Sequence, residues 1–560
     1  MTKTPTTLAL LCFMLSAVAA IATERPNVVF FAFDDLRPLI SAYGDKEVVT
    51  PNLDKLAVAG VQFNRSYVAY PLCKPSRATM LNGLRFDNAP VNGKWPNHAQ
   101  LIGKQKTWPR VLRDAGYWTA SRGKVYHGNV PGVDRGAWDI PGGRKSDWND
   151  EILAAIVDQG GRPDQLEGYL KSGNGAGALV WVSVDGPDNI LNDGQVCDDV
   201  ISYIREQRDS DKPFAIACGF SRPHMPWVAP KKYFDLYPED ASELAYIPEG
   251  AEKVVDPEEV TKKNNNALWN EGVDDAAAKR LIRGYMACVS YVDAQMGKVI
   301  QVLKEEGLYE NTIIVAWGDH GYHLTDHGLW RKNTAYNVSL RAPLIIKAPG
   351  IQGGKSVDQV VGNVDLYPTL MELTGVSAPA DVVLHGKSLV PLLNDPEAEW
   401  ENITYTCAKE RYGLVTDRYR FTVSENGSSL YDLANDPHEW VNLAGRAEYA
   451  TLVKEFEKKL EAVVWNEPSL LKADGEKSGA KRPSTRTAKA KSTSKWDWFA
   501  ALDTDKDALV TEKEWLARAR SKAKKRGETF EEKRQKRIFA DYDSNSDGHL
   551  TREELERHSK

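Results

Sequence analysis

The sequence predicts an α/β fold built around a mostly parallel sheet, and two features of the chain carry this prediction. Continuous apolar runs, typical of strands buried on both faces, occur at Asn27–Phe33, Pro213–Phe220 and Thr312–Trp317. Amphipathic stretches with helical spacing lie between them, for example Gly284–Glu306. Because strands that alternate with helices pair in parallel, we expect one sheet covered by helices. A chain of 560 residues is long enough for two or three domains.

The first 22 residues have the features of a secretory signal peptide. Lys3 supplies the positive start, an apolar core runs from Leu8 to Ala20, and small residues precede Thr23. An uncleaved anchor is the less favoured alternative, since the apolar run is short for a membrane span and no later stretch is long enough. We therefore expect a secreted or periplasmic protein with no membrane span.

Composition and cysteine spacing argue against nucleic acid as a partner and against a structural zinc site. A hydrophobic content of 42% and a charged content of 27% are ordinary for soluble globular proteins, and a net charge of −6 gives no reason to expect nucleic acid. The absence of C-x-x-C spacing argues against a structural zinc site. Cys12 leaves with the signal peptide, and Cys73 is considered below. Four others can form three different pairings or stay free thiols: Cys197, Cys218, Cys288 and Cys407.

Polar side chains follow the predicted strands. Asp34 and Asp35 follow the first run, His224 comes shortly after the second, and Asp319 and His320 follow the third. The carboxyl ends of parallel strands share one edge of the sheet, which is where α/β proteins place their sites. Carboxylates gathered there suit a hard divalent cation, whereas one isolated Asp is more simply a loop or capping residue. Nitrogen is an unusual calcium ligand, so this chemistry alone does not include His320.

Three segments follow the main domain, which we place at residues 23–374. Residues 375–465 form a smaller α+β subdomain, with short strands near Glu401–Ala408 and Tyr419–Val423 and a closing helix at Ala447–Val464. Residues 466–495 are rich in Lys, Arg, Ser, Thr and Ala and form a flexible basic linker. Such a run is more often solvated than bound to a sulfated polymer.

Residues 496–560 contain two twelve-residue loops with calcium-ligand spacing, at 503–514 and 543–554. Oxygen side chains at loop positions 1, 3 and 5, with Glu at 12, enclose a hard cation, and Gly at 6 permits the turn. The tail resembles an α-helical EF-hand pair with a stabilising role. Ala508 replaces the expected Gly, so the first loop could instead be a degenerate structural partner. The predicted ligands are Asp503, Asp505, Asp507, Glu514, Asp543, Asn545, Asp547 and Glu554.

The pentapeptide Cys73-Lys74-Pro75-Ser76-Arg77 has the pattern C-x-P-S-R. It resembles the motif in which a formylglycine-generating enzyme oxidises the cysteine of type I sulfatases, although five residues alone also fit a buried cysteine beside a turn. Further motifs in the family's order extend the resemblance from about residue 25 to 465. They are Asp34-Asp35, Gly123-Lys124-x-x-His127, Gly318-Asp319-His320-Gly321, and Leu430–Leu433 with Asp436-Pro437. The resemblance implies an alkaline-phosphatase-like sandwich.

Within this family the chain most resembles the iduronate-2-sulfatases. The segments Asp34–Pro38, Tyr43–Asp45 and Arg222–Pro226 match that branch, and His320 stands where many sulfatases have Asn. Arg222 departs from the branch, which commonly has Lys at this position. No residue is identified as the one that binds a uronate carboxylate.

The resemblance also implies roles for individual residues. Cys73, as formylglycine, is the nucleophile and a metal ligand, and Arg77 holds the nucleophile and the metal carboxylates in place. Lys124 and Lys332 bind sulfate, His127 is the base that assists the nucleophile, and His224 is the acid for the leaving oxygen or a further sulfate contact. The implied calcium site is completed by Asp34, Asp35, Asp319 and His320. His323 and His327 receive no role.

These expectations combine into a secreted, calcium-dependent sulfatase. The implied substrate is a 2-O-sulfated uronate at the end of a polysaccharide, as in glycosaminoglycan degradation. Other sulfated glycans, such as a fucan or ulvan, are an alternative. A phosphatase or phosphodiesterase is disfavoured, since such sites typically use a Ser or Thr nucleophile and more metal ligands. A calcium-dependent glycan-binding protein with a silent site is the rival from another class.

Overall fold

The computed structural model describes most of the chain between residues 25 and 465 and parts of the tail. The described residues are 25–86, 96–143, 152, 154–155, 158–159, 179–239, 242–249, 267–269, 273–424, 427–465, 509–526, 532, 536, 539–540, 543 and 549–551. The predicted signal peptide, the basic linker and six of the eight tail ligands lie outside them; Glu514 and Asp543 lie inside. The chain divides into two compact units, Met1–Ser484 and Thr485–Lys560.

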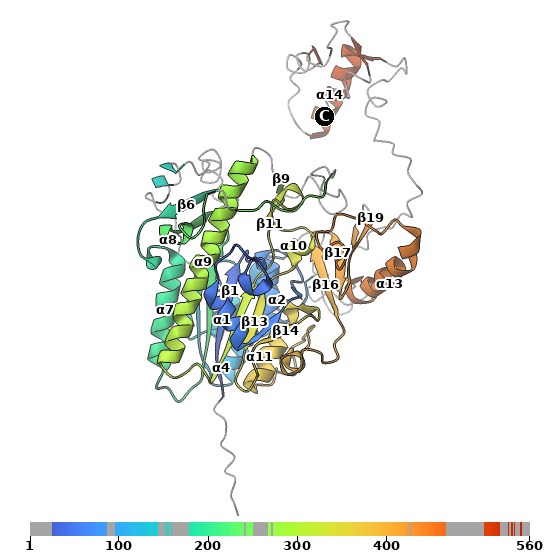
Figure 1. Cartoon of the computed structure of the whole chain (residues 1–560). Helices are drawn as coiled ribbons and strands as arrows, with labels where there is room; N and C mark the ends of the chain where they lie inside the picture. The colour runs from blue at the N-terminus through green and yellow to red at the C-terminus, as the bar shows by residue number, and fades with distance from the viewer. Residues whose placement is uncertain are drawn as a thin grey trace, which may run out of the picture. The chain divides into compact units, whose positions relative to one another are not determined.

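An eight-stranded sheet forms the centre of the first unit (Figure 1). β13 runs antiparallel to both of its neighbours, and the other strand pairs are parallel. The prediction of a mostly parallel sheet is therefore confirmed. In spatial order the strands are β14 (Lys355–Val357), β2 (Val61–Phe63), β13 (Leu344–Lys347), β10 (Thr312–Gly318), β1 (Asn27–Asp34), β7 (Phe214–Pro223), β4 (Trp118–Gly123) and β5 (Ile140–Pro141).

β1 shows why the central strands have continuous apolar sequences. Val29 and Phe31 pack into a core with α7 (Asn192–Gln207) and α9 (Asp275–Glu305). Val28 and Phe30 face the opposite core. That second core includes side chains of α2 (Cys73–Asn82), α4 (Trp108–Asp114) and α11 (Leu366–Thr374). Since helices cover both faces, every residue of β1 is buried, and its polar side chains are confined to the first residue, Asn27, and the last, Asp34.

Two predicted boundaries differ from the structure. α9 begins at Asp275, well before the predicted Gly284, because the Asp274 side chain caps it by accepting the N–H of Ala277 at 2.7 Å. β7 extends past the predicted end at Phe220 to Pro223. There it still pairs with Asp34, across a register shift in which β7 carries two extra residues, Ser221 and Arg222.

A separate antiparallel sheet lies towards the C-terminal end of this unit. It consists of β16 (Ile403–Ala408), β17 (Arg411–Thr416), β18 (Tyr419–Ser424) and β19 (Gly427–Asp432), in that order. α13 (Ala450–Leu460) packs on it, with the Phe456 and Phe421 rings 5.7 Å apart. β16, β18 and α13 correspond to the predicted strands and closing helix, whereas β17 and β19 are further strands with no counterpart among the predicted elements.

The other described elements are short. The helices are α1 (Pro51–Ala59), α3 (His98–Ile102), α8 (Lys231–Phe234), α10 (Asn337–Leu340) and α12 (Val390–Asn394), with one-turn helices η4 (Asp326–Gly328) and η5 (Asn363–Asp365). The strands are β3 (Ser66–Tyr67), β6 (Trp181–Val184), β8 (Trp227–Pro230), β9 (Ala267–Trp269), β11 (His323–Leu324), β12 (Leu329–Arg331) and β15 (Val361–Gly362). The five described cysteines are all buried and free, so the structure forms none of the possible pairings.

In the second unit the described residues place two short strands together. β20 (Val510–Thr511) pairs with β21 (His549–Leu550), and Val510 lies opposite Leu550. α14 (Glu512–Arg526) follows β20, and the Glu514 carboxylate accepts the N–H of Thr511 at 3.0 Å. No helix in the described part of the chain has the length and apolar character needed to cross a bilayer.

Candidate active site

The pairing of β1 with β10 brings three carboxylates together at the carboxyl edge of the sheet. Phe33 lies opposite Gly318, so Asp34, Asp35 and Asp319 leave the two strands side by side. The backbone N–H of Asp35 donates to Asp319 Oδ1 at 3.0 Å. Asp35 has a left-handed backbone (φ 65°), and the Tyr285 hydroxyl donates to its carbonyl at 2.8 Å. Contacts from β10 and α9 thus fix the turn that presents the acids.

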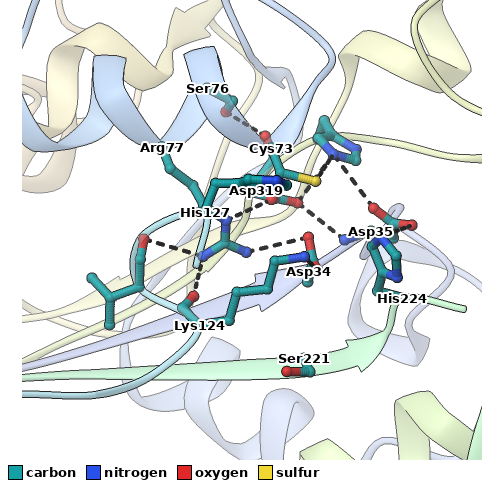
Figure 2. A network of polar contacts seen from close by, with 12 residues as sticks. Asp34, Asp35, Cys73, Ser76, Arg77, Lys124, His127, Ser221, His224 and Asp319 are labelled. Carbon is teal, nitrogen blue, oxygen red and sulfur yellow. Dashed lines mark hydrogen bonds and ion pairs between the residues drawn. The ribbon is translucent and has the colours of Figure 1, made fainter. Parts of the chain in front are cut away.

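α2 adds a sulfur atom to this group. Cys73 is the first residue of the helix and is buried, and its Sγ lies 3.4 Å from His320 Nε2. The same nitrogen lies 3.4 Å from Asp35 Oδ1 and 3.5 Å from Asp319 Oδ1. Potential ligand atoms of Asp34, Cys73, Asp319 and His320 all lie within 4.8 Å of one another. Figure 2 shows Cys73 facing the carboxylates from the helix above them.

The donor set fits a divalent cation. Asp34 Oδ1 and Asp35 Oδ2 are buried carboxylate oxygens with no hydrogen-bond partner. Burying such atoms without a hydrogen bond is costly. The ion pair of Asp34 Oδ1 with Arg77 Nη2, at 3.4 Å, offsets part of this cost, and a bound cation would offset more. The structure thus brings Asp34, Cys73, Asp319 and His320 into one group, and an overlapping group consists of Asp34, Asp35, Cys73 and His224. Metal binding by these residues stays a prediction.

Three buried cations balance the three carboxylates, and two of them, Arg77 and Lys124, are seen in Figure 2. Arg77 Nε donates to Asp319 Oδ2 at 2.8 Å, and its Nη2 lies 3.4 Å from Asp34 Oδ1. Lys124 pairs with Asp34, and Lys332 pairs with Asp35. Burial alone would raise the pKa of Asp319, but Arg77 and the other nearby cations hold it below its ordinary value. The Asp319 carboxylate consequently stays ionised.

The unmodified Cys73 thiol is a poor nucleophile in this setting. Burial raises its pKa to about 12, and the negative charges of Asp319 and Asp35 add to this effect. Lys332 and Arg77 oppose the shift without reversing it. Since the thiolate is the reactive form, the thiol is almost entirely inert at neutral pH.

Asp34, Asp35 and Asp319, together with Arg77, Lys124 and Lys332, form a charged cluster. Two histidines lie beside it. His127 follows Lys124 after β4 and keeps an exposed side chain, while its backbone N–H donates to His98 Nε2 at 3.3 Å. Partial burial, together with Lys124 and Lys74, lowers the pKa of His127, so its imidazole is neutral at neutral pH. His224 follows β7, with Nε2 4.0 Å from Asp35 Oδ2 and Nδ1 2.5 Å from the Met225 carbonyl oxygen.

The loop that carries Lys332 has an unusual backbone. Thr325, His327, Arg331 and Asn333 all have positive φ angles, between 55° and 77°. Each such residue costs on the order of 1–3 kcal/mol unless its surroundings enforce it, and residues of this kind concentrate at functional sites. His323, which had no predicted role, is buried here with Nε2 2.7 Å from Thr334 Oγ1. It supports the loop from inside.

Several supporting residues were not found from the sequence. The Asn363 side chain donates to the carbonyl and the hydroxyl of Ser76, at 3.1 Å each, and so holds α2. The Asp193 carboxylate accepts the N–H groups of Ser221 and Arg222 at 2.8 Å and fixes the loop before His224. These contacts join segments far apart in sequence and leave no local pattern. Arg222 itself donates to the Val228 carbonyl at 3.0 Å and braces the same loop.

Comparison with known proteins identifies the family. The family model described as Sulfatase matches residues 26–376, which is more than half of the chain. The chain belongs to the sulfatase family. A second model, described as N-sulphoglucosamine sulphohydrolase, C-terminal, matches residues 325–466 of this sulfatase.

Individual relatives agree with this assignment. The sulfatase is 32% identical over 447 residues to a sulfatase of Formosa agariphila, covering 77% of this chain and 85% of the relative. It is 30% identical over 405 residues to iduronate 2-sulfatase of Mus musculus, covering 64% and 70%. The structure of a phosphonate monoester hydrolase from Silicibacter pomeroyi superposes with a TM-score of 0.58 at 22% identity, covering 78% and 94%, and shows the shared fold. The sulfatase is therefore a sulfuric ester hydrolase with the alkaline-phosphatase-like fold.

Proposed function

We propose that this protein is an exported, calcium-dependent sulfatase that acts on sulfated polysaccharides through a formylglycine made from Cys73. The position of Cys73 carries the proposal: it begins α2 within the C-x-P-S-R motif and lies 3.4 Å from His320, beside three buried carboxylates. A formylglycine-generating enzyme would act on it during maturation. The relatives named iduronate 2-sulfatase, from Mus musculus and Homo sapiens, favour a 2-O-sulfated uronate at a chain end as the substrate.

The two groups that the family uses would supply distinct chemistry. Formylglycine in hydrated form offers an oxygen nucleophile, and a calcium ion bound by Asp34, Asp35, Asp319 and His320 would stabilise negative charge near the sulfate. Arg77 keeps two of these carboxylates in register through its bonds to Asp319 and Asp34. The reacting sulfur would thus meet a preorganised, water-poor site.

The remaining side chains bind the ester and move protons. Lys124 and Lys332 are buried ammonium groups that can turn from Asp34 and Asp35 to the sulfate oxygens. His127 is neutral and can accept a proton from the nucleophile. His224, whose Nε2 lies 4.0 Å from Asp35 Oδ2, would protonate the leaving sugar oxygen.

Defined sulfated saccharides test this proposal. The wild-type protein should release sulfate from a disaccharide with a terminal 2-O-sulfated uronate faster than from fucan or ulvan fragments. Cys73→Ala should release none, and chelation should abolish release until calcium is restored. A wild-type protein that releases no sulfate from any of these compounds would contradict the hydrolase proposal, whereas preference for a fucan or ulvan fragment would contradict only the uronate.

The C-terminal unit supports a second calcium-binding proposal. Val510 and Leu550, which pair between β20 and β21, both occupy position eight of their predicted twelve-residue loops. That equivalence supports an EF-hand-like pair with Asp543 and Glu554 in one loop and Glu514 in the other. Glu554→Gln should lower the number of calcium ions bound per chain, measured by equilibrium dialysis. An unchanged stoichiometry would contradict binding by the second loop.

A further inference from the structure

A polar cavity is lined in part by the loop that connects Asp319 to Lys332. Its volume is about 220 Å³, and it is enclosed by η4, α10 and the segment after β19. Its described lining includes none of the residues assigned to metal, sulfate or proton transfer. Its lining includes the side chains of Arg37, Tyr246, His327, Asn337, Arg341 and Trp440.

Aromatic rings form one side of this cavity. The His327 ring stacks on Tyr336 with centroids 4.0 Å apart and an angle of 11°, and its centroid is 4.6 Å from that of Trp440. At the rim, Tyr246 is 57% exposed and lies 5.0 Å from His438. Clustered flat rings with polar edges offer an apolar surface to the C–H face of a sugar while keeping hydrogen-bonding groups nearby.

The polar groups around these rings are incompletely paired. Three of the lining charges are neutralised, since Arg37 pairs with Asp326 at 2.8 Å and Glu439 pairs with Arg420. Arg341 Nε donates to the Asn64 carbonyl at 2.7 Å, but no carboxylate lies within ion-pair distance of Arg341 in the described part of the chain.

Two further buried atoms have no hydrogen-bond partner. They are Trp440 Nε1, a donor, and Asn337 Oδ1, an acceptor. The Arg341 guanidinium and the Trp440 N–H, from residues that line the same cavity, suit an anionic oxygen, and the Asn337 amide oxygen suits a hydroxyl. A sugar that carries a carboxylate or sulfate offers both kinds of group.

Two segments contribute residues both to the cavity and to the charged cluster. Arg37 follows Asp34-Asp35 along the chain, and its Nη1 donates to the Tyr322 carbonyl at 3.3 Å. Asp326 and His327 lie between Asp319 and Lys332. A polysaccharide with its terminal sulfate at Cys73 would therefore meet the cavity walls with a neighbouring unit.

We propose that this cavity is a subsite for a second anionic sugar of the substrate chain. The sugar ring packs on Trp440 and His327, and its carboxylate or sulfate binds Arg341 and the Trp440 N–H. This inference rests on the proposed function, because it requires a polysaccharide substrate.

The test compares a substrate that reaches this cavity with one that cannot. The first is a tetrasaccharide with a terminal 2-O-sulfated uronate, and the second is 4-nitrocatechol sulfate, which has no sugar. Trp440→Phe, Trp440→Ala and Arg341→Lys should each lower kcat/KM for the tetrasaccharide about tenfold more than for the aryl ester, mainly through KM, as expected for one lost charge-assisted hydrogen bond. The matched control is Trp400→Phe, since Trp400 Nε1 already donates to Val360 at 2.8 Å. It should affect both substrates equally.

Equal losses on the two substrates in the Trp440 and Arg341 variants, or no loss on either, would overturn the subsite. Binding separates this failure from failure of the proposed function. If the wild-type protein cleaves neither substrate, the tetrasaccharide is titrated into Cys73→Ala and into Cys73→Ala with Trp440→Ala. Weaker binding by the double variant supports the subsite. Absence of binding, or equal binding by both proteins, overturns it.

Discussion

Arg77 determines the geometry of the charged cluster at the scale of single residues. Its guanidinium is fully buried and contacts Asp319 and Asp34 with different nitrogens, while a third nitrogen donates to the Lys124 carbonyl. A planar, rigid fork can hold several acceptors at once, whereas an ammonium group is a single point charge. The relative position of the Asp34 and Asp319 carboxylates thus depends on one side chain.

Arg77→Lys should keep the positive charge but lose the simultaneous contacts of the guanidinium with Asp319, Asp34 and the Lys124 carbonyl. We expect kcat/KM for sulfate release to fall about a hundredfold, because displacement of reacting groups by about 1 Å has effects of that size. Steady-state kinetics on an aryl sulfate measure the loss. Arg110→Lys is the matched control, since Arg110 is exposed and pairs with Asp114 at 3.0 Å. A value for Arg77→Lys within a fewfold of wild type would exclude this role.

The ends of neighbouring strands hold the site together at the scale of elements. Gly123, the last residue of β4 and the residue before Lys124, has φ 75° and lies against β7. A Cβ atom there would sit 2.0 Å from the Gly219 carbonyl oxygen. Gly116 also has positive φ (99°), but a Cβ there would meet nothing within 4 Å. A side chain at Gly123 would therefore cause both backbone strain and a steric clash, whereas one at Gly116 would cause backbone strain alone.

Gly123→Ala should lower the free energy of unfolding by about 3 kcal/mol or more, since it combines strain with overpacking. Gly116→Ala should cost about 1 kcal/mol from its backbone alone. Urea unfolding followed by tryptophan fluorescence compares the two. Equal costs would show that the close approach of β4 and β7 is not rigid.

The contact between His385 and Arg85 should make the free energy of unfolding depend on pH. Its Nδ1 accepts the N–H of Arg85, after α2, at 3.0 Å, and burial together with Arg85 lowers its pKa from 6.5 to about 4. Between these values the unfolded chain binds a proton at His385 and the folded chain does not. The His385 contribution to the free energy of unfolding is therefore fully present above pH 6.5 and is lost as the pH falls towards 4, by at most about 3 kcal/mol.

His385→Asn should retain an acceptor for Arg85 and remove this dependence. Unfolding curves at pH 7 and pH 4.5 should show a smaller loss of stability for the variant than for wild type. His438→Asn, at an exposed position, serves as control and should follow wild type. If His385→Asn has the wild-type pH dependence, the proton uptake occurs elsewhere.

The sequence predicts the elements whose signals are local. β1, β7 and β10 are recognisable because both of their faces are buried, and Asp34, Asp35 and Asp319 follow because parallel strands end at one edge. The support from Asn363 and Asp193 is not predictable in this way. Each joins a loop to a segment distant in sequence, and only the folded chain brings them together.

The cavity beside η4 could not be predicted from the sequence for the same reason. Its walls come from residues near positions 37, 246, 327–341 and 437–440, none of which forms a motif with the others in sequence. The strands β17 and β19 were missed because short antiparallel strands with mixed polarity resemble loops. Role assignments, in contrast, came from the family resemblance and stay predictions.

Two compact units divide the whole molecule, and only the first contains the charged cluster. Deletion of residues 466–560 should therefore leave soluble protein with wild-type kcat/KM for sulfate release and remove the calcium bound by the tail. Kinetics and equilibrium dialysis on the truncated chain check both points. A truncated protein that is folded but inactive would make the C-terminal unit part of the catalytic machinery.

Mass spectrometry of the peptide that carries residue 73 tests the central claim most directly. The protein should be produced with a formylglycine-generating enzyme and digested without reduction or alkylation. The account predicts that an aldehyde replaces the thiol at position 73 in protein that releases sulfate, and that preparations with more aldehyde are proportionally more active. Sulfate release by protein that carries only an unmodified Cys73 would contradict it.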